Sequence, residues 1–219
     1  MYGEGRYKFK NSIYRGKREF RDLKKKKWFV KNSSERFIKH IETDPINPIN
    51  FYGLSKLFQE QIVKQCSKEL GVNYTILRYS IVQGPRQSFF NTYSGLCRNL
   101  ISSYLKGERP IIFEDGLSSR DFVNIDDVTR ANIKVINNKS AYEQIFNIGG
   151  GKKYTLIEFD NIVRSKLKTD LLPIVDGVEL HRGMTLQEGQ VLGYVGHLAD
   201  YENTGLNGHV DSKIVSGAA

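Results

Sequence analysis

The feature that most restricts the fold of this chain is a regular alternation of helix-like and strand-like runs between residues 41 and 167. The first helix is predicted over residues 51–70, where apolar side chains recur at helical spacing, and Gly71 follows as a stop signal. NYTILRYSIV comes next, rich in β-branched and aromatic residues, which is typical of a strand buried on both faces. Such alternation predicts an α/β domain with mostly parallel strand pairing.

The alternation continues beyond this strand. A second helix is predicted over residues 95–106, and short strands are predicted at PIIFE and RDFVNI. Asp126 or Asp127 is expected to cap a helix that ends near Ile136. QIFNIGGG has the pattern of a strand that enters a glycine loop. The last helix is predicted to follow the capping-box pattern of Thr155 and to end at residue 167.

The two ends of the chain differ from this central part. Residues 1–40 hold 14 Lys and Arg against 4 Asp and Glu, whereas the remaining residues hold 19 basic and 20 acidic side chains. We interpret this segment as a solvated, irregular insertion; a nucleic-acid contact through KKKK and its neighbouring Trp and Phe is the alternative. Residues 169–219 are rich in Gly and Val with frequent turn signals, so a β-rich tail of uncertain origin is predicted there. We therefore expect a basic segment at 1–40, an α/β domain at 41–168 and a tail at 169–219.

Composition excludes several classes of protein. No apolar run approaches the roughly 18 residues that a membrane span requires, and the N-terminus lacks the pattern of a signal peptide. Two cysteines are too few for a disulfide scaffold, so a reducing cytoplasm is expected. His181, His197, His209 and Asp200 are interpreted as surface or packing residues, and no metal site is predicted.

Tyr52 and Lys56 are the first candidates for chemistry. Their i, i+4 spacing in the predicted helix places both side chains on one face. A tyrosine acts as a general base only when its pKa, about 10 without perturbation, is lowered. A neighbouring lysine ammonium favours the phenolate by Coulomb attraction, which suits removal of a hydroxyl proton. The Y-x-x-x-K spacing alone is a weak signal, because chance produces it often.

Four motifs in a fixed order make the signal specific. NFYGLSKLFQE, LRYSIVQGPRQS, FEDGLSSRDFVNIDDV and FNIGGG follow one another, and YGEGRY opens the chain. Together they resemble the NAD-dependent epimerase/dehydratase family of the extended short-chain dehydrogenases/reductases, in particular sugar-nucleotide 4-epimerases of the UDP-glucose 4-epimerase type. The resemblance covers residues 1 to about 167. It implies an α/β fold made of the C-terminal part of a Rossmann-like parallel sheet and a small substrate domain.

The resemblance also implies roles for individual residues. Tyr52 matches the family's catalytic base, and Lys56 matches its partner, which also holds the nicotinamide ribose of NAD. Arg120 matches the arginine that contacts the substrate's diphosphate, with a surface ion pair to Asp121 or Glu114 as the alternative. The implied cofactor-binding residues are Tyr52, Lys56, Tyr79, Ser80 and Val82. The implied substrate-binding residues are Ile81, Arg86 and Arg120.

The sequence departs from the family pattern at several places. The family usually has Asn at the position of Ile81, Tyr at that of Gln83, and frequently His at that of Asn124. Neither the glycine fingerprint G-x-x-G-x-x-G nor the family's catalytic Ser or Thr is found, and GGGKK is interpreted as a turn. We therefore expect an N-terminally truncated, partial epimerase, impaired as an isolated chain.

Other functions remain open. The first alternative is a non-catalytic module that binds a nucleotide sugar or pairs with a partner, and the second is a basic nucleic-acid-binding protein. The expected partners are a nucleotide-sugar substrate and either a second copy of the chain or a complementing Rossmann-domain chain, with no membrane. Nucleic acid is the less favoured partner.

Overall fold

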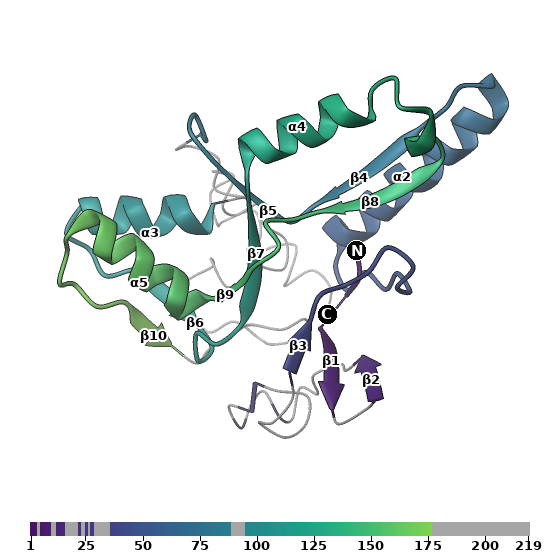
Figure 1. Cartoon of the computed structure of the whole chain (residues 1–219). Coiled ribbons are helices and arrows are strands. Elements are labelled where there is room, and N and C mark those ends of the chain that lie inside the picture. Colours follow the sequence, from purple (N-terminus) through teal and green to yellow (C-terminus); the bar gives the residue numbers. More distant parts are fainter. Residues whose placement is uncertain are drawn as a thin grey trace, which may run out of the picture. The chain divides into compact units, whose positions relative to one another are not determined.

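The fold was examined in a computed structural model of the chain, drawn in Figure 1. It describes residues 1–3, 5–9, 12–15, 22, 25, 27–28, 36–88 and 95–176. These residues form two compact units, which are described separately. Unit 1 comprises residues 1–85 and 117–156, and unit 2 comprises residues 86–116 and those from 157 onward.

Helix α2 (Phe51–Leu70) begins and ends where the sequence predicts. Asn50 caps its first turn, and Gly71 ends it with a left-handed backbone (φ 65°) that glycine adopts without strain. The burial of α2 is unusual, because its buried residues are not the apolar ones. The residues buried in the chain are Gly53, Glu60 and Ser67, whereas an apolar row on the opposite side is exposed. The residues of this row are Phe51, Leu54, Phe58 and Ile62.

Two parallel strands run alongside α2 in unit 1 (Figure 1). β4 (Thr75–Tyr79) and β8 (Gln144–Ile148) pair in register from Thr75 opposite Gln144 to Tyr79 opposite Ile148. The sequence predicted a strand buried on both faces here, and this prediction is wrong. Within β4 only Ile76 is buried, and Tyr79 at its end is exposed.

A three-stranded sheet forms next to this pair along the chain. β5 (Ile81–Gln83) pairs in parallel with β7 (Ser119–Asn124), and β7 pairs in antiparallel fashion with β9 (Lys153–Thr155). Val123 at the centre of β7 is 1% exposed. The predicted run NYTILRYSIV is thus two strands, β4 and β5, that join different sheets.

Helix α4 (Ile125–Val135) follows β7 directly. The side chain of Asn124 caps it by accepting a hydrogen bond from the Asp126 N–H at 2.8 Å. The prediction that Asp126 or Asp127 is the cap is therefore wrong. Both acidic residues lie in the first turn instead, where a negative charge also stabilises a helix. A short 3₁₀ helix, η1 (Lys139–Ala141), precedes β8.

The N-terminal segment contributes a small antiparallel sheet that the sequence did not predict. β1 (Arg6–Phe9) lies between β2 (Ser12–Arg15) and β3 (Arg36–Ile38). Tyr7 on the central strand is 3% exposed. The irregular segment expected over residues 1–40 thus contains three strands, although much of it, including Lys24 and Lys26, lies outside the described residues.

Unit 2 is built around two helices, α3 (Leu96–Leu105) and α5 (Leu156–Leu167), the second of which begins at the boundary between the units. Leu100, Tyr104 and Val163 form its buried core. The strands β6 (Ile111–Phe113) and β10 (Ile174–Asp176) pair in parallel.

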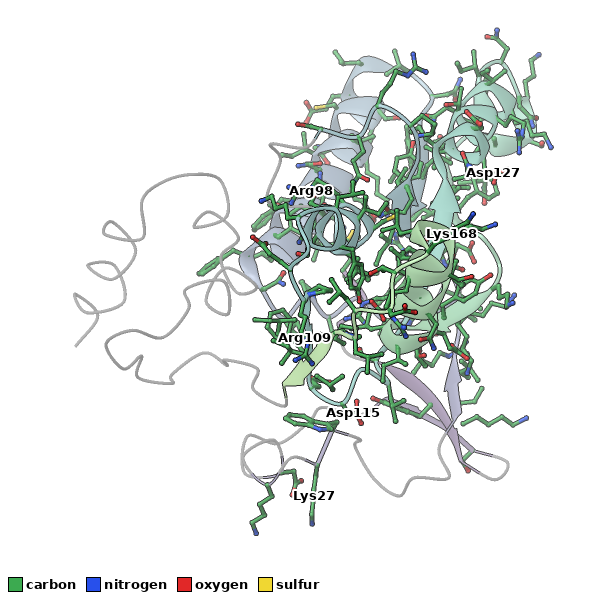
Figure 2. All side chains as sticks on the ribbon, turned by 90° about the vertical axis from the view of Figure 1, so that its left-hand side faces the viewer. Lys27, Arg98, Arg109, Asp115, Asp127 and Lys168 are labelled. Carbon is green, nitrogen blue, oxygen red and sulfur yellow. The ribbon has the colours of Figure 1, made fainter. Side chains whose placement is uncertain are left out.

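Arg109 lies beside β10 (Figure 2). It donates to the carbonyl of Leu172 from Nε at 2.8 Å and to that of Pro173 from Nη2 at 3.3 Å. The described part of the chain thus continues past residue 169, where the sequence predicts a change of character. The predicted β-rich tail lies outside the described residues beyond residue 176, and the predicted domain boundaries stay a prediction.

The chain is therefore an α/β structure whose longer strands pair in parallel, as the sequence predicts. Within its described part, no helix combines the length and the apolar character needed to cross a membrane.

Candidate active site at the start of helix α2

Tyr52 and Lys56 lie in the first two turns of α2, where the local sequence determines the start of the helix. The side chain of Asn50 accepts a hydrogen bond from the Gly53 N–H at 2.7 Å, which satisfies one of the N–H groups that a helix start leaves unpaired. Because the cap lies at residue 50, Tyr52 is the second residue of the helix and Lys56 follows on the same face.

The two side chains lie next to each other, which confirms the prediction that they share a face. Lys56 Nζ is 5.5 Å from the centroid of the Tyr52 ring, and it donates to Gln59 Oε1 at 3.2 Å. Tyr52 is 49% exposed, so its hydroxyl can reach a molecule bound outside the helix. This arrangement can accept a proton from a hydroxyl group.

The residues after β4 take up several different environments. The Tyr79 hydroxyl donates to Asn132 Oδ1 on α4 at 3.0 Å. The Ser80 hydroxyl donates to Asp121 Oδ1 at 3.2 Å. Ile81 and Val82 follow in β5, where they pair with the central residues of β7. Tyr79, Ser80, Ile81 and Val82 are thus held within unit 1 by contacts to α4 and β7.

The two candidate arginines belong to different units. Arg120 lies on β7 of unit 1 and is exposed, and its Nη1 donates to Ser118 Oγ at 2.7 Å and to the Ser119 carbonyl at 3.0 Å. Arg86 is the first residue of unit 2, is exposed, and has a left-handed backbone with φ 69°. Arg120 therefore shares its unit with Tyr52 and Lys56, and Arg86 does not.

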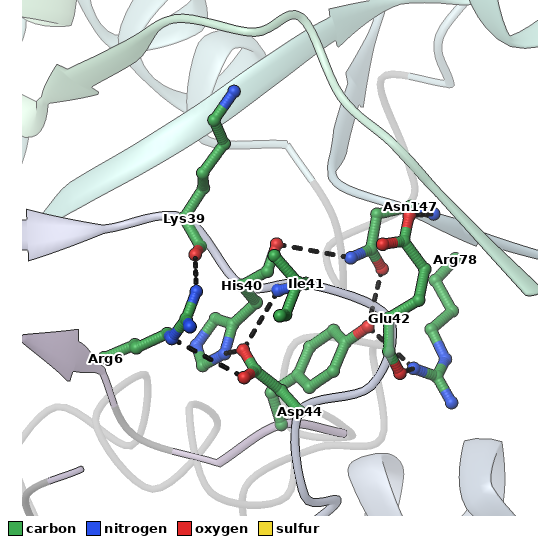
Figure 3. Close-up of polar contacts among 9 residues, drawn as sticks. Arg6, Lys39, His40, Ile41, Glu42, Asp44, Arg78 and Asn147 are labelled. Carbon is green, nitrogen blue, oxygen red and sulfur yellow. Dashed lines mark hydrogen bonds and ion pairs between the residues drawn. The ribbon is translucent and has the colours of Figure 1, made fainter. Parts of the chain in front are cut away.

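A network of charged and polar groups supports α2 from its buried side, and Figure 3 shows the part of it that connects Arg78 and Asn147 to the segment before α2. Arg78 on β4 donates from Nε and Nη2 to the two carboxylate oxygens of Glu60, both at 2.8 Å. Its Nη1 also donates to the Tyr2 hydroxyl at 2.6 Å. The hydrogen bonds to Glu60 are the main cause of the raised pKa of Arg78. A buried fork-to-fork pair of this kind fixes both direction and distance.

The network extends from Arg78 to the segment before α2. The Tyr2 hydroxyl donates to Asn147 Oδ1 at 2.7 Å, and the Tyr2 ring stacks on the His40 ring at a centroid distance of 4.6 Å. His40 Nδ1 lies 3.1 Å from Asp44 Oδ2, and Arg6 Nε lies 3.5 Å from the other oxygen of Asp44. These contacts join β1, β4, β8 and the segment before α2.

The sequence analysis missed Glu60 as a supporting residue. It follows Tyr52 by eight residues and Lys56 by four, which is the spacing of one helix face, and this was the signal available. Its partner Arg78 is 18 residues away on another element, so the pair itself could not be found from local spacing.

Two departures from the family pattern are neighbours in the fold. Gln83 on β5 is the registered partner of Asn124 on β7. The Gln83 Oε1 atom is buried and, within the described part of the chain, has no hydrogen-bond partner. Buried acceptors are usually satisfied, so this atom is suited to contact a bound molecule.

NAD binding would need protein groups for the ribose hydroxyls and for the diphosphate of the cofactor. The Lys56 ammonium lies over the ring of the exposed Tyr52, and a hydroxyl and an ammonium group are suited to the hydroxyls of a ribose. The glycine loop does not fit the diphosphate of the cofactor. The N–H groups of Gly150 and Gly151 already donate to the Asp121 carboxylate, at 2.6 Å and 3.2 Å. The interpretation of this loop as a turn agrees with this geometry.

Metal-ligating side chains are not gathered in the described residues, which contain no group of three or more His, Cys, Asp or Glu placed to hold an ion. His181, His197, His209 and Asp200, which the sequence analysis considered, lie outside the described residues. Cys66 is exposed and Cys97 half-buried, both as free thiols, and burial raises the pKa of Cys97.

Comparison with known proteins identifies the source of these motifs. Residues 29–149 match the profile of the NAD dependent epimerase/dehydratase family. A Methanocaldococcus jannaschii protein provisionally assigned as a UDP-glucose 4-epimerase is 40% identical over 126 residues, which cover 58% of this chain and 40% of the relative. The dTDP-L-rhamnose 4-epimerase of Burkholderia thailandensis is 30% identical over 167 residues, covering 74% of this chain and 45% of that relative.

A solved structure agrees with these sequence matches. The UDP-glucose 4-epimerase of Thermotoga maritima, determined with UDP-glucose, matches with a TM-score of 0.59 and 32% identity, over 67% of this chain and 47% of the other. This chain therefore spans less than half the length of each of these three relatives. The order of its motifs, the parallel strand pairs and the match over residues 29–149 lead to one conclusion. The chain belongs to the NAD dependent epimerase/dehydratase family.

Proposed function

We propose that the chain supplies the substrate-side part of a sugar-nucleotide 4-epimerase, with Tyr52 as the base and Lys56 as its partner. The observation that carries this proposal is the contact between Lys56 Nζ and the Tyr52 ring, 5.5 Å to the centroid, on an exposed part of α2. Similarity to relatives named as UDP-glucose and dTDP-L-rhamnose 4-epimerases supports a hexose linked to UDP or dTDP as the substrate class.

Tyr52 has the central role in this reaction. Its phenolic oxygen accepts the proton of the sugar hydroxyl that is oxidised, and returns the proton when the carbon is reduced from the other face. Lys56 stabilises the negative charge on that oxygen and holds ribose hydroxyls of the cofactor. When NAD is bound, it takes up and gives back the hydride. Tyr79, Ser80 and Val82 are proposed to contact the same cofactor; the Tyr79 hydroxyl donates to Asn132.

Arg120 is the proposed contact to the diphosphate of the substrate. Its planar guanidinium group suits two phosphate oxygens at once. Two neighbouring oxygens, Ser118 Oγ and the Ser119 carbonyl, hold Nη1 and so restrict the direction of the side chain. Ile81 is proposed to contact the same nucleotide sugar, and the role of Arg86, which belongs to unit 2, stays a prediction. Ile81 brings no polar atom to it, so the affinity rests more heavily on Arg120.

The proposed activity requires a partner. The 219 residues contain no G-x-x-G-x-x-G sequence, and the N–H groups of the loop at residues 149–151 are engaged by Asp121. The apolar row of α2 supports a partner on this helix, since Phe51, Phe58 and Ile62 are 69%, 57% and 60% exposed. We expect a complementing Rossmann-domain chain in a cytoplasmic setting, with a second copy of this chain as the other outcome of the test.

A second candidate is a module that binds the nucleotide sugar without chemistry. The occupied glycine loop favours it, because binding through Arg120 needs no cofactor. The two candidates differ in one outcome: both predict binding of UDP-glucose, and only the first predicts turnover after complementation.

Calorimetry with UDP-glucose tests the proposal. The wild-type chain should bind UDP-glucose without turning it over. Arg120→Ala should weaken binding roughly tenfold or more, because losing a charge-assisted hydrogen bond costs about 1.5–3 kcal/mol. Arg130→Ala is the matched control, since Arg130 is exposed on α4 and pairs with Asp127. Failure of the wild-type chain to bind, or equal losses for the two variants, would overturn the assignment.

A further inference from the structure

The carboxylate of Asp121 lies at the junction of three of the motifs in unit 1. It accepts hydrogen bonds from the N–H groups of Gly150 and Gly151, at 2.6 Å and 3.2 Å, and from the Ser80 hydroxyl at 3.2 Å. Successive backbone N–H groups form a concave site that attracts anions. Here the anion is supplied by the chain itself.

The glycines of the loop are shaped to admit this contact. A Cβ atom on Gly149 would lie 2.7 Å from Asp121 Oδ2, and one on Gly150 would lie 2.1 Å from the Phe122 carbonyl oxygen. Both distances are shorter than real side chains allow, so the loop can approach β7 this closely only because these two residues are glycine.

The contact controls where β9 meets β7. The loop leads directly into β9, whose residues pair with β7 as Asp121 opposite Lys153 and Arg120 opposite Tyr154. The other end of the contact is Ser80, whose backbone N–H donates to the Ile148 carbonyl at 2.9 Å. Asp121 therefore connects the end of β8, the start of β9 and the link between β4 and β5.

Arg120 and Asp121 are held by different groups. Arg120 Nη1 donates to Ser118 and Ser119 on its own strand, whereas the Asp121 carboxylate is bound by the loop and by Ser80. The surface ion pair considered in the sequence analysis would hold Asp121 through the side chain of Arg120. In this geometry Asp121 instead contacts the loop N–H groups and the Ser80 hydroxyl. Asp121 acts on the backbone that carries its neighbour.

We infer that Asp121 is a positioning residue, which fixes the segment of β7 and β9 from which Arg120 reaches the diphosphate of a nucleotide ligand. The inference rests on the proposed function, since it assigns Asp121 a role at that same site. It adds a residue that neither the Y-x-x-x-K pair nor the glycine loop indicates. Ser80 then has a second role, as the link through which the cofactor-side strand is joined to the same carboxylate.

A double-mutant cycle with two probes, UDP and uridine, tests the inference by calorimetry. UDP carries the diphosphate and uridine does not. Asp121→Asn should weaken UDP binding about tenfold and change uridine binding less than about twofold, as expected for loss of one charge-assisted contact behind Arg120. In the Arg120→Ala background, Asp121→Asn should cause little further loss, because residues that act through one contact are not additive.

The controls separate positioning from a loss of structure. Asp127→Asn on α4 is the matched substitution at an exposed acidic residue and should leave both affinities unchanged. If Asp121→Asn does not fold, Ser80→Ala removes one of the three hydrogen bonds and should give a smaller loss that is again confined to UDP.

The outcomes are distinct. A loss that is equal for UDP and uridine, a loss that adds fully to that of Arg120→Ala, or a lowered melting temperature with unchanged UDP affinity would overturn the inference alone. Absence of UDP binding by the wild-type chain would overturn the proposed function, and this inference with it.

Discussion

In unit 1 helix α2 is joined to its strand pair by a charged fork, whereas in unit 2 the two helices pack through an apolar core that also contains the carboxylate of Asp160. In unit 1 the fork between Arg78 and Glu60 joins β4 to α2. In unit 2 Leu100 and Val163 pack at the centre, and Asp160, 0% exposed, accepts from the Tyr104 hydroxyl at 2.5 Å and from Arg164 Nε at 2.8 Å.

The difference follows from which side of each helix is buried. The helices of unit 2 turn apolar side chains toward each other. α2 instead turns Gly53, Glu60 and Ser67 inward and leaves its apolar row exposed. The attachment of α2 to β4 therefore relies on directional contacts, which stabilise less per buried side chain and fail when one partner is removed. A unit of this kind is expected to gain stability when a partner covers α2.

The largest expected effect is on the charged network. Glu60→Ala removes one side of a pair whose side chains are only 7% and 10% exposed. Because Arg78 is then left buried without its carboxylate, unit 1 should lose about 3–5 kcal/mol. Hydrogen exchange at amides of β4 and β8 measures this loss.

Glu69→Ala is the matched control on the same helix. Glu69 is exposed and, among the described residues, accepts only from Gln65, so its removal should change stability by less than about 0.5 kcal/mol. Similar losses in the two variants would remove the distinction between the units.

A smaller effect is expected at the buried acid of unit 2. Tyr104→Phe removes the hydroxyl that donates a hydrogen bond to Asp160, and should lower the free energy of chemical unfolding by about 1–3 kcal/mol. The apolar packing of the ring remains, which is why the loss is smaller than that of Glu60→Ala. A loss above that of Glu60→Ala would reverse the comparison.

The same residue predicts a pH dependence. Burial, together with the hydrogen bond to Asp160, raises the pKa of Tyr104. At a pH above about 10, the ordinary tyrosine pKa, the unfolded chain releases this proton while the folded chain keeps it. The stability that Tyr104 contributes is therefore present below the pKa of the unfolded chain and is lost as pH rises beyond it. Unfolding of wild type and Tyr104→Phe between pH 9 and 11 tests this, with the wild type expected to lose more. Tyr142→Phe serves as the matched control, and identical curves for wild type and Tyr104→Phe would refute the link.

The smallest effect on stability is expected on the exposed row of α2. Phe58 is 57% exposed, so Phe58→Gln should change the free energy of unfolding of the isolated chain by less than about 0.5 kcal/mol. It should nevertheless weaken association with a partner. Size-exclusion chromatography with light scattering measures this association. Leu70 is also exposed and lies on another side of α2, so Leu70→Gln should leave the association intact. A melting temperature strongly lowered by Phe58→Gln would show that the row is already packed.

Much of the fold was predictable because its signals are local. The bounds of α2 follow from apolar spacing and from Gly71, and the side-by-side placement of Tyr52 and Lys56 follows from the helical period. The cap of α4 was misplaced by two residues because Asn124 and Asp126 are both good capping residues, and only the backbone geometry shows which one is used.

The parts that could not be predicted depend on contacts between distant residues. Glu60 and Arg78 are 18 residues apart, and Asp121 and Gly150 are 29 residues apart. Neither pair lies within one helix or strand, so no local period predicts the contact. The antiparallel sheet of β1, β2 and β3 was missed for the same reason, since β1 and β3 are separated by a basic stretch without strand signals.

The central claim is that Tyr52 and Lys56 form an epimerase base that works only in a completed fold. The direct test is conversion of UDP-glucose to UDP-galactose with NAD present. The 219-residue chain is assayed alone and mixed with a polypeptide carrying the part of the Methanocaldococcus relative that this chain does not cover. We predict no turnover alone, turnover in the mixture, and a loss of about 100-fold or more with Tyr52→Phe. Turnover by the chain alone, turnover that survives Tyr52→Phe, or none in a mixture that elutes as one complex would contradict the claim.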